Sequence, residues 1–373
     1  MTRAIRIGRL FGVDIEIDYT WFIVFFLVAA LLATGWFSRQ LPGISPGLRW
    51  LVGFATAALF FLSVLLHELS HSLVAIRSGL RISGITLFLF GGVSKMADEP
   101  KSARVEFLMA IAGPAASLLL AALFLLLSHL LRGAPGGHLL ATVFQWLGLM
   151  NGSLAVFNLV PGFPLDGGRL LRAGLWAATH SLTESTRIAS SFGQVIGFLM
   201  IVVGVLLALT HDLSALWLAL IGWFLVQAAQ QSYQHVIFRQ SLLGVPVSSV
   251  MTTQVDWVPA AATLDQVVHE HVMVRSHPAF PVLDNTSLLG LLSLTDIRHV
   301  PQERWPYVTA AQVVPPLAEG QTIPPTADAW DALVRMGAGG FGRLLVTRDG
   351  ALLGIISRTD VMRLLHRRME LGV

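Results

Sequence analysis

The sequence predicts a polytopic α-helical membrane protein with about six transmembrane helices, followed by a soluble α/β domain that contains an internal repeat. Two properties predict the membrane part: 54% of the 373 residues are hydrophobic and only 13% are charged, about half the charged share of a soluble globular chain. The mean hydropathy is +0.68. Two similar segments near the C-terminus predict the repeat. The net charge is only +3, and the basic residues form no stripe that would bind nucleic acid. We therefore expect the lipid bilayer, and no nucleic acid, among the partners.

Six apolar stretches are long enough to cross a bilayer, because about 20 helical residues span its hydrocarbon core. Five of them contain no Asp, Glu, Lys or Arg, and the second is interrupted by Glu68 alone. We therefore expect no charged residue inside the spans other than Glu68. The stretches are 21–37, 51–76, 107–131, 139–160, 191–210 and 213–234.

Positive charges are distributed unevenly between the connections. The N-terminal segment and the connections after the second and fourth spans carry Arg3, Arg6, Arg9, Arg77, Arg81, Lys95, Lys101, Arg104, Arg169, Arg172 and Arg187. The alternate connections carry Arg39, Arg49 and Arg132. Because Lys and Arg collect on the cytoplasmic side, we expect a multi-pass protein of the cell membrane. Its N-terminus and, after six spans, its C-terminal domain then lie in the cytoplasm.

The C-terminal repeat consists of an apolar strand, a turn, a second strand and a Ser-x-Thr-Asp sequence that opens a helix. The copies lie at 280–298 and 343–363, and their shared element is Gly-h-h-Ser-x-Thr-Asp, where h is apolar, at 290–296 and 354–360. This doublet resembles a pair of cystathionine-β-synthase-type (CBS) domains. The resemblance implies two stacked repeats that often bind an adenine nucleotide such as ATP or AMP, and that commonly associate into a homodimer.

The Thr-Asp pairs are the candidate nucleotide-binding residues. A Thr hydroxyl at a helix N-terminus can donate to phosphate, and the adjacent carboxylate can accept from ribose hydroxyls. The alternative is that Thr295, Asp296, Thr359 and Asp360 only cap their helices. We expect a membrane domain over 1–240, a first CBS domain over 245–305 and a second over 306–373.

The motif His67-Glu68-Leu69-Ser70-His71 lies inside the second apolar stretch. Residues four apart share a helix face, so both imidazoles point to one place. This geometry suits two nitrogen ligands of zinc, with Glu68 close enough to act on a water molecule. Ionisable residues within transmembrane segments are rare and usually functional. A pair of histidines bonded to other spans, or a proton or ion pathway, remain alternatives.

A catalytic zinc ion needs a third protein ligand and an open position, and Asp166 is the best candidate. The fourth span ends among Pro161 and Pro164, which disfavour continued helix. The second and fourth spans both run towards the cytoplasm, so Asp166 and the two histidines are expected at similar depth. Taken alone, Asp166 could instead be the N-cap of the amphipathic segment 169–178.

These motifs together resemble the site-2 protease family of intramembrane zinc metalloproteases. The resemblance rests on the His-Glu-x-x-His motif, on Gly113-Pro114 in the third span, and on Asn158-x-x-Pro161-Gly162-x-Pro164-Leu165-Asp166-Gly167. It implies one Zn²⁺ per chain held by His67, His71 and Asp166, with Glu68 as the catalytic base. The family also includes members with a C-terminal CBS pair.

The resemblance further implies hydrolysis of peptide bonds in or near the transmembrane segment of membrane-anchored substrate proteins, modulated by nucleotide at the CBS pair. The segment 81–95 resembles the family's membrane-dipping β-hairpin, with Gly91 and Gly92 at its turn. An edge strand of this hairpin could bind an unwound substrate by strand addition. The Asn158 amide could hold the substrate backbone or the developing oxyanion, or could bond neighbouring helices.

Two other functions remain open from the sequence. One is a CBS-regulated membrane channel or transporter with a metal site, although the spans show no inverted repeat. The other is a different membrane metalloprotease whose catalytic helix faces the cytosol and whose third ligand is a downstream Glu.

Overall fold

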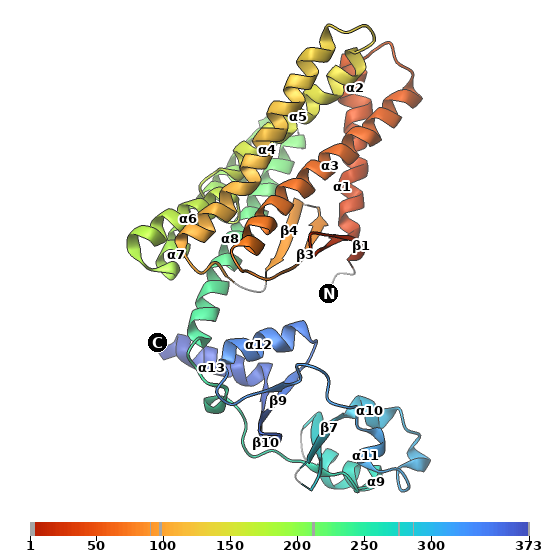
Figure 1. The fold of residues 1–373 in the computed structure, drawn as a ribbon, viewed down its shortest axis with the longest axis vertical. Helices are drawn as coiled ribbons and strands as arrows, with labels where there is room; N and C mark the ends of the chain where they lie inside the picture. Colours follow the sequence, from red (N-terminus) through yellow and green to blue (C-terminus); the bar gives the residue numbers. More distant parts are fainter. Residues whose placement is uncertain are drawn as a thin grey trace. The chain divides into compact units, whose positions relative to one another are not determined.

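The computed structural model describes residues 4–89, 91–96, 99–210, 213–274, 277–285 and 287–371. The chain divides into two compact units, residues 1–234 and 235–373 (Figure 1). The first unit contains the apolar helices and the second contains the repeat.

The described residues form six helical segments that are long and apolar enough to cross a membrane, as the sequence predicts. They are Tyr19–Gln40, Pro46–Arg77, Ala103–Arg132, His138–Asn158, Leu182–Thr210 and Leu213–Leu242. The first segment combines α1 (Tyr19–Leu31), a π-helical turn η1 (Leu32–Trp36) and α2 (Phe37–Gln40). The next four are α3, α4, α5 and α7, and the last joins the 3₁₀ turn η2 (Leu213–Ala215) to α8 (Leu216–Leu242).

Helix α4 packs along α3, α5 and α6 in the first unit (Figure 1). Helix α6 (Asp166–Thr179) is the amphipathic segment expected over 169–178, extended by three residues at its N-terminal end. It connects α5 to α7 and packs against both α4 and α7. The end of α6 that carries Asp166 is therefore held between two long helices.

A small sheet covers one end of α3 (Figure 1). Its strands are β1 (Ile5–Leu10), β2 (Val13–Ile17), β3 (Ile82–Phe88) and β4 (Gly91–Met96), in that order across the sheet. The hairpin expected from the sequence is present as β3 and β4. Gly91 and Gly92, expected at its turn, instead begin β4, which is an edge strand.

Strands β1 and β2 are an addition that the sequence did not suggest. The segment VDIEI alternates in polarity, and this alternation buries Val13, Ile15 and Ile17 against residues of α3 and β3. Strand β2 pairs with β3 in parallel. On the sheet, Glu16 accepts from Lys95 Nζ at 2.5 Å and from Thr86 Oγ1 at 3.1 Å. The hydrogen bond from Lys95 holds the pKa of Glu16 below its usual value, so this carboxylate stays charged and joins β2 to the edge strand.

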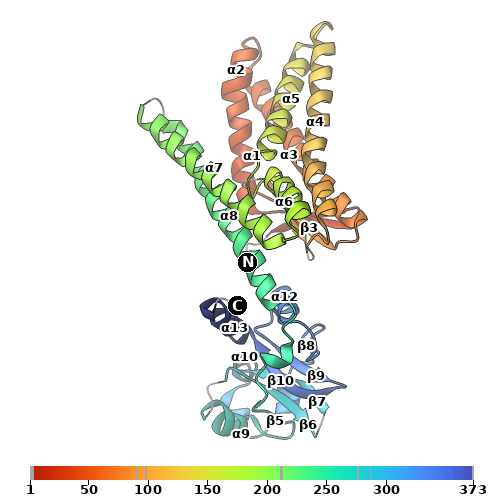
Figure 2. The same ribbon diagram turned by 90° about the vertical axis from the view of Figure 1, so that its left-hand side faces the viewer.

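The second unit contains two copies of one three-stranded arrangement, which confirms the internal repeat. The first copy has β5 (Val258–Pro259), β6 (Ala279–Asp284) and β7 (Ser287–Ser293), and the second has β8 (Thr322–Ile323), β9 (Arg343–Arg348) and β10 (Ala351–Ser357). In each sheet the first two strands pair in parallel and the last two antiparallel. Figure 2 shows both sheets with their helices.

The helices of the second unit are short, apart from those that close the second repeat. They are the 3₁₀ turns η3 (Val247–Ser249) and η5 (Gln302–Arg304), the π-helical η4 (Val267–Val272), and α9 (Leu264–Gln266), α10 (Leu294–Arg298), α11 (Ala310–Val313), α12 (Ala329–Ala338) and α13 (Arg358–Leu371). Each repeat has its own apolar core. The last turns of α8 belong to this unit, because Leu242 is buried in the same core as Val361 and Leu365.

Candidate metal centre

Two histidines of α3 and one aspartate of α6 meet inside the first unit. His67 and His71 are one helical turn apart on the buried face of α3, and Asp166 is the first residue of α6. The Nε2 atoms of the two histidines are 3.2 Å apart, and each is 3.2 Å from Oδ2 of Asp166. All three side chains are buried or nearly so, with exposed fractions of 3%, 5% and 9%. The structure thus brings together the three residues that the sequence singled out as ligands.

The spacing of these three atoms fits a zinc ion. Three ligand atoms of a tetrahedral zinc ion, at bond lengths of about 2.0–2.1 Å, are about 3.3 Å from one another. Two imidazole nitrogens and one carboxylate oxygen are also a typical donor set for catalytic zinc, with the fourth position left for water or substrate. In the described part of the chain, this is the one group of three His, Cys, Asp or Glu side chains that could hold a metal ion.

The far side of each imidazole is held by α4. His71 Nδ1 lies 2.6 Å from the carbonyl oxygen of Met109, and His67 Nδ1 lies 2.9 Å from the hydroxyl of Ser117. A carbonyl oxygen only accepts hydrogen bonds, so His71 carries its proton on Nδ1 and directs the lone pair of Nε2 at the cluster. Contacts of this kind fix the tautomer and orientation of metal-binding histidines.

Gly113 of α4 leaves space for the two imidazoles. A Cβ atom at this position would lie 2.2 Å from His71 Nε2 and 2.6 Å from His67 Nε2. No side chain fits at such a distance. The Gly113-Pro114 element of the sequence therefore has a steric explanation in the site itself.

Glu68 lies beside the cluster on α3 and faces the edge strand β4. A Cβ atom on Gly92 would lie 2.4 Å from Glu68 Cγ, so this glycine lets the strand pass directly over the glutamate. Nearby, the hydroxyls of Ser72 and Ser94 are 3.1 Å apart and join α3 to β4. Within the described residues the Glu68 carboxylate has no hydrogen-bond partner, so it is available to a water molecule or a substrate.

The remaining residues proposed for substrate binding lie at element ends. Asn158 is the last residue of α5, half-buried, and its side-chain amide has no hydrogen-bond partner in the described part of the chain. Gly91 is the first residue of β4, with φ of 129°. Residues 159–165, between Asn158 and Asp166, are not helical. The amide of Phe163 donates to the carbonyl of Ala189 on α7 at 3.1 Å, which anchors this segment.

Asp166 is not the N-cap of α6, which was the alternative for it. The N-cap position is Leu165, and Oδ2 of Asp166 lies 3.2 Å from Nε2 of each histidine instead. This placement favours the ligand interpretation over the capping interpretation.

The expectation that Glu68 is the one charged residue inside the spans is wrong. Helix α4 begins at Ala103, four residues before the apolar run, and this places Glu106 inside the helix with 0% exposure. Its partner is Arg172 of α6, which is also buried and is therefore not a solvated loop charge. Sequence reasoning missed this pair. A signal was present in the spacing of α6. Arg172 follows Gly168 by four residues, which places the arginine on the same buried face of the helix as this glycine.

In the CBS repeats, both candidate aspartates cap helices. The Asp296 Oδ2 atom accepts from the Ser293 amide at 2.8 Å and from its hydroxyl at 2.5 Å. Asp360 makes the same contacts with Ser357, at 2.9 and 2.6 Å. Thr295 and Thr359 are exposed. The capping role is thus present in both copies, and one oxygen of each carboxylate is not used for it.

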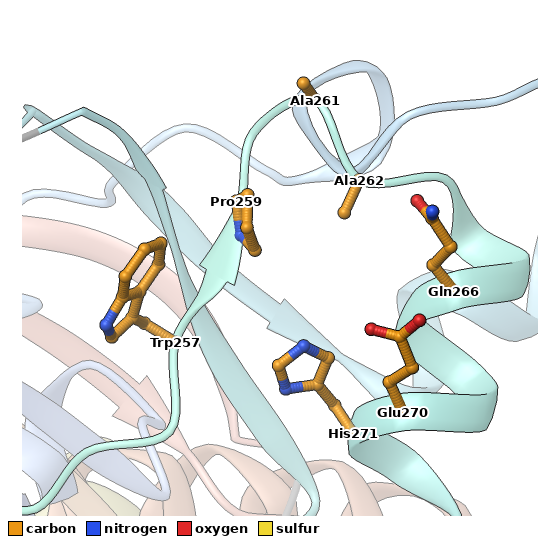
Figure 3. Close-up of a pocket in the computed structure, with 7 residues that line it drawn as sticks. All are labelled: Trp257, Pro259, Ala261, Ala262, Gln266, Glu270 and His271. Atoms are coloured by element: carbon orange, nitrogen blue, oxygen red, sulfur yellow. The ribbon is translucent and has the colours of Figure 1, made fainter.

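Two hollows lie in the second unit. One, of about 390 Å³, includes Thr359 together with Phe238, Arg363 and His366 in its lining. The other, of about 530 Å³, belongs to the first repeat and is shown in Figure 3. Its lining consists of Trp257, Pro259, Ala261, Ala262, Gln266, Glu270 and His271. Thr295 and Asp296 do not line the hollow of the first repeat. No sequence motif singled out the residues that do line it.

Comparison with known proteins gives the same division of the chain. The sequence profile described as "Peptidase family M50" matches residues 55–138 and 136–204. The profile described as "CBS domain" matches residues 247–303 and 313–367. The first pair of matches contains the cluster of His67, His71 and Asp166, and the second pair contains the two repeats.

Curated relatives match over almost the whole chain. Rip3 of Mycobacterium tuberculosis, provisionally named a zinc metalloprotease, is 34% identical over 98% of this chain and 93% of its own length. The protein sll0528 of Synechocystis, named in the same way, is 32% identical over 98% and 96%. Zinc metalloprotease MJ0392 of Methanocaldococcus jannaschii is 29% identical over 97% and 96%.

Among solved structures, the site-2 protease from Methanocaldococcus jannaschii is 33% identical. It aligns with 62% of this chain and 95% of its own, at a TM-score of 0.44. The CBS domain of a bacterial CNNM/CorC family Mg²⁺ transporter, solved in complex with ATP, is 20% identical. That domain aligns with 36% of this chain and 97% of its own, at a TM-score of 0.31.

The contact of Gly113 with both imidazoles yields a prediction. Gly113→Ala should weaken zinc binding by at least about 10-fold, because the new methyl group displaces the histidine nitrogens, and displaced ligand geometry costs roughly this much. The zinc dissociation constant, measured by competition with a chromophoric chelator, checks this. Gly152→Ala is the matched control, since its Cβ would meet only Ala121 at 3.9 Å. Equal affinities for the two variants would contradict the prediction.

Proposed function

The chain belongs to peptidase family M50, the site-2 protease family, and is a multi-pass membrane zinc metalloprotease with a C-terminal CBS pair. On this premise we propose that it hydrolyses peptide bonds in or near the transmembrane segment of membrane-anchored proteins. His67, His71 and Asp166 hold the zinc ion and Glu68 is the base. The observation that carries this proposal is the set of three 3.2 Å separations between two Nε2 atoms and one Oδ2 atom.

The protein's own groups divide the chemistry between them. Zinc, when bound, polarises a peptide carbonyl and makes a water molecule more acidic. Glu68 accepts the proton of the attacking water and then donates it to the leaving amine. Because its carboxylate has no competing hydrogen bond among the described residues, it can turn between these two positions. We assign Asn158, whose amide is also without such a partner there, the donation of a hydrogen bond to a substrate carbonyl.

The substrate must be extended where it is cut, because a helix locks its carbonyls in internal hydrogen bonds. We assign the binding of the extended segment to the edge strand β4. One side of β4 pairs with β3, and on the other side the described residues form no strand. Gly92 of the same strand lies against Glu68. A substrate strand added to β4 would have its freed backbone groups satisfied and would lie beside the base.

The two other functions left open by the sequence have less support. The family assignment argues against a channel or transporter. A metalloprotease with a downstream Glu ligand would need a third ligand other than Asp166, whereas Asp166 already stands at 3.2 Å from both histidines.

We assign the CBS pair a regulatory role through binding of ATP or AMP. Its Thr-Asp elements recur in both repeats, and each aspartate keeps one carboxylate oxygen outside the capping contacts. The count of positive charges supports a cytoplasmic position for this unit, where adenine nucleotides are abundant. Association of two CBS pairs would make the protein a homodimer.

The first test separates zinc binding from proton transfer. His67→Ala should lose the single zinc ion per chain, as measured by metal analysis of the purified full-length protein. Glu68→Gln should keep the zinc ion, because the amide leaves the three ligands in place. It should nevertheless cleave a model transmembrane substrate at least about 10²-fold more slowly, the usual contribution of general acid–base catalysis. Full zinc content in His67→Ala, or undiminished cleavage by Glu68→Gln, would refute the proposed roles.

The edge strand can be tested with proline, which removes one backbone N–H donor. Val93 and Ser94 are neighbours on β4, so their N–H groups point to opposite sides of the strand. Of Val93→Pro and Ser94→Pro, the variant that loses the outward N–H should cleave about 2- to 10-fold more slowly, the loss of one hydrogen bond to substrate, and should keep its zinc. Val93→Thr, which keeps the donor, is the control. Unchanged cleavage by both proline variants would contradict strand addition.

Nucleotide binding can be separated from helix capping. Asp296→Ala and Asp360→Ala should weaken ATP binding and change the cleavage rate, because both remove the carboxylate expected to bind ribose. Ser293→Ala and Ser357→Ala remove the hydroxyl contacts of the same caps but keep the carboxylates and their backbone donors, so they should bind ATP as the wild type does. Isothermal titration calorimetry measures the affinities. Equal losses in the serine and aspartate variants would leave only capping, and no ATP binding by the wild type would remove the regulatory role.

A further inference from the structure

A buried ion pair joins two of the helices that surround the metal centre. Arg172 of α6 donates through Nε to Oε1 of Glu106 on α4 at 2.7 Å, and its Nη2 atom contacts the same oxygen. Glu106 has 0% exposure and Arg172 has 7%. The mechanism proposed above uses neither residue.

Arg172 also contacts two further segments. Its Nη1 atom donates to the hydroxyl of Thr186 on α7 at 3.4 Å. Its guanidinium carbon lies 4.9 Å from the centre of the Phe163 ring, a cation–π distance. Phe163 belongs to the non-helical segment that ends at Asp166. One side chain thus contacts α4, α7 and the segment that leads to a zinc ligand.

The partners of Arg172 lie close in sequence to both halves of the cluster. Glu106 precedes Met109 by three residues, about one helical turn, and the carbonyl of Met109 holds His71. Gly113, which packs against both imidazoles, follows on the same helix. On the other side, Phe163 precedes Asp166 by three residues and Arg172 follows it by six. The pair therefore connects the element that orients the histidines to the element that carries the aspartate.

The chemistry of the pair argues against stability as its main contribution. Removing two charges from water is costly, and apolar residues of similar size often stabilise a protein as well or better. One oxygen of Glu106, Oε2, is also buried without a hydrogen-bond partner among the described residues. A pair that leaves an acceptor unsatisfied is poorly suited to stabilising the fold. Instead, two N–H donors of Arg172 meet the single Oε1 atom of Glu106. These two contacts fix the distance and orientation of α6 against α4.

We propose that the Glu106–Arg172 pair positions Asp166 against His67 and His71 and thereby sets the affinity of the metal centre. Glu106 and Arg172 are positioning residues, since neither touches the metal ligands. The pair acts by holding α6 and the segment around Phe163 at a fixed place on α4. This inference rests on the proposed zinc site.

The test measures zinc affinity and thermal stability separately in the full-length protein in detergent. Arg172→Met and Glu106→Gln should each raise the zinc dissociation constant about 10- to 100-fold, the usual effect of removing an outer-shell contact. Each also separates a buried charge from its close partner and should lower the melting temperature, because Arg169, whose Nε atom lies 4.0 Å from Glu106 Oε1, only partly replaces Arg172. The double variant Glu106→Gln/Arg172→Met removes both charges of the pair, so its melting temperature should recover in part while its zinc affinity stays low. Phe163→Leu, which keeps both charges, should weaken zinc binding by a smaller factor.

Two comparisons make the outcomes decisive. Arg187→Gln breaks an exposed ion pair with Glu184, 3.5 Å apart on α7, and should leave zinc affinity unchanged. Wild-type zinc affinity in the double variant and in Phe163→Leu would overturn the inference, and both can be read even where the single variants do not fold. If the wild type binds no zinc, or binds it equally well after His67→Ala, the proposed metal site fails instead.

Discussion

The structure of the membrane unit depends on one local requirement, which is to hold three electron-pair donors 3.2 Å apart where little water reaches them. The Asp166 oxygen only accepts hydrogen bonds, and His71 Nε2 offers a lone pair when the proton of His71 sits on the far side of its ring, opposite Met109. The surrounding helices therefore hold these atoms close together, in an arrangement that a cation would stabilise. Helix α4 does most of this, because it contributes the carbonyl of Met109, the hydroxyl of Ser117 and the absent side chain of Gly113.

The third donor arrives by a different route. Asp166 follows a non-helical segment, and irregular backbone is tolerated at membrane depth only where protein or a water-filled cavity surrounds it. Here the segment is bonded to α7 through Phe163 and Ala189. An aspartate at the start of a short helix would otherwise be positioned only by the connection that precedes it. Arg172 of the same helix contacts Glu106, Thr186 and Phe163. These contacts attach the helix to α4, to α7 and to the connecting segment.

The sequence predicted the parts of this arrangement that follow from local periodicity. Long apolar runs gave the six helices, and a four-residue spacing placed His67 and His71 on one face. Asp166 was selected because helix-breaking prolines precede it and because charge counting placed it at the same membrane depth as the histidines. The sequence thus predicted a shared depth, but not that the three side chains are in contact. Other features were out of reach, because they depend on which elements are neighbours. Residues 5–17 become strands only because α3 and β3 offer an apolar surface, and the burial of Glu106 depends on Arg172, which α6 supplies.

The consecutive residues His67 and Glu68 face different neighbours, since successive residues of a helix are about 100° apart. His67 faces α4 and α6, whereas Glu68 faces β4 through Gly92. The face of α3 that carries the two histidines and the strand that lies against Glu68 are thus distinct. The outward side chains of β4, such as the half-exposed Val93, contact no metal ligand. Under the proposed function, exchange of a few residues of β4 would change the substrate preference while the metal chemistry stays the same.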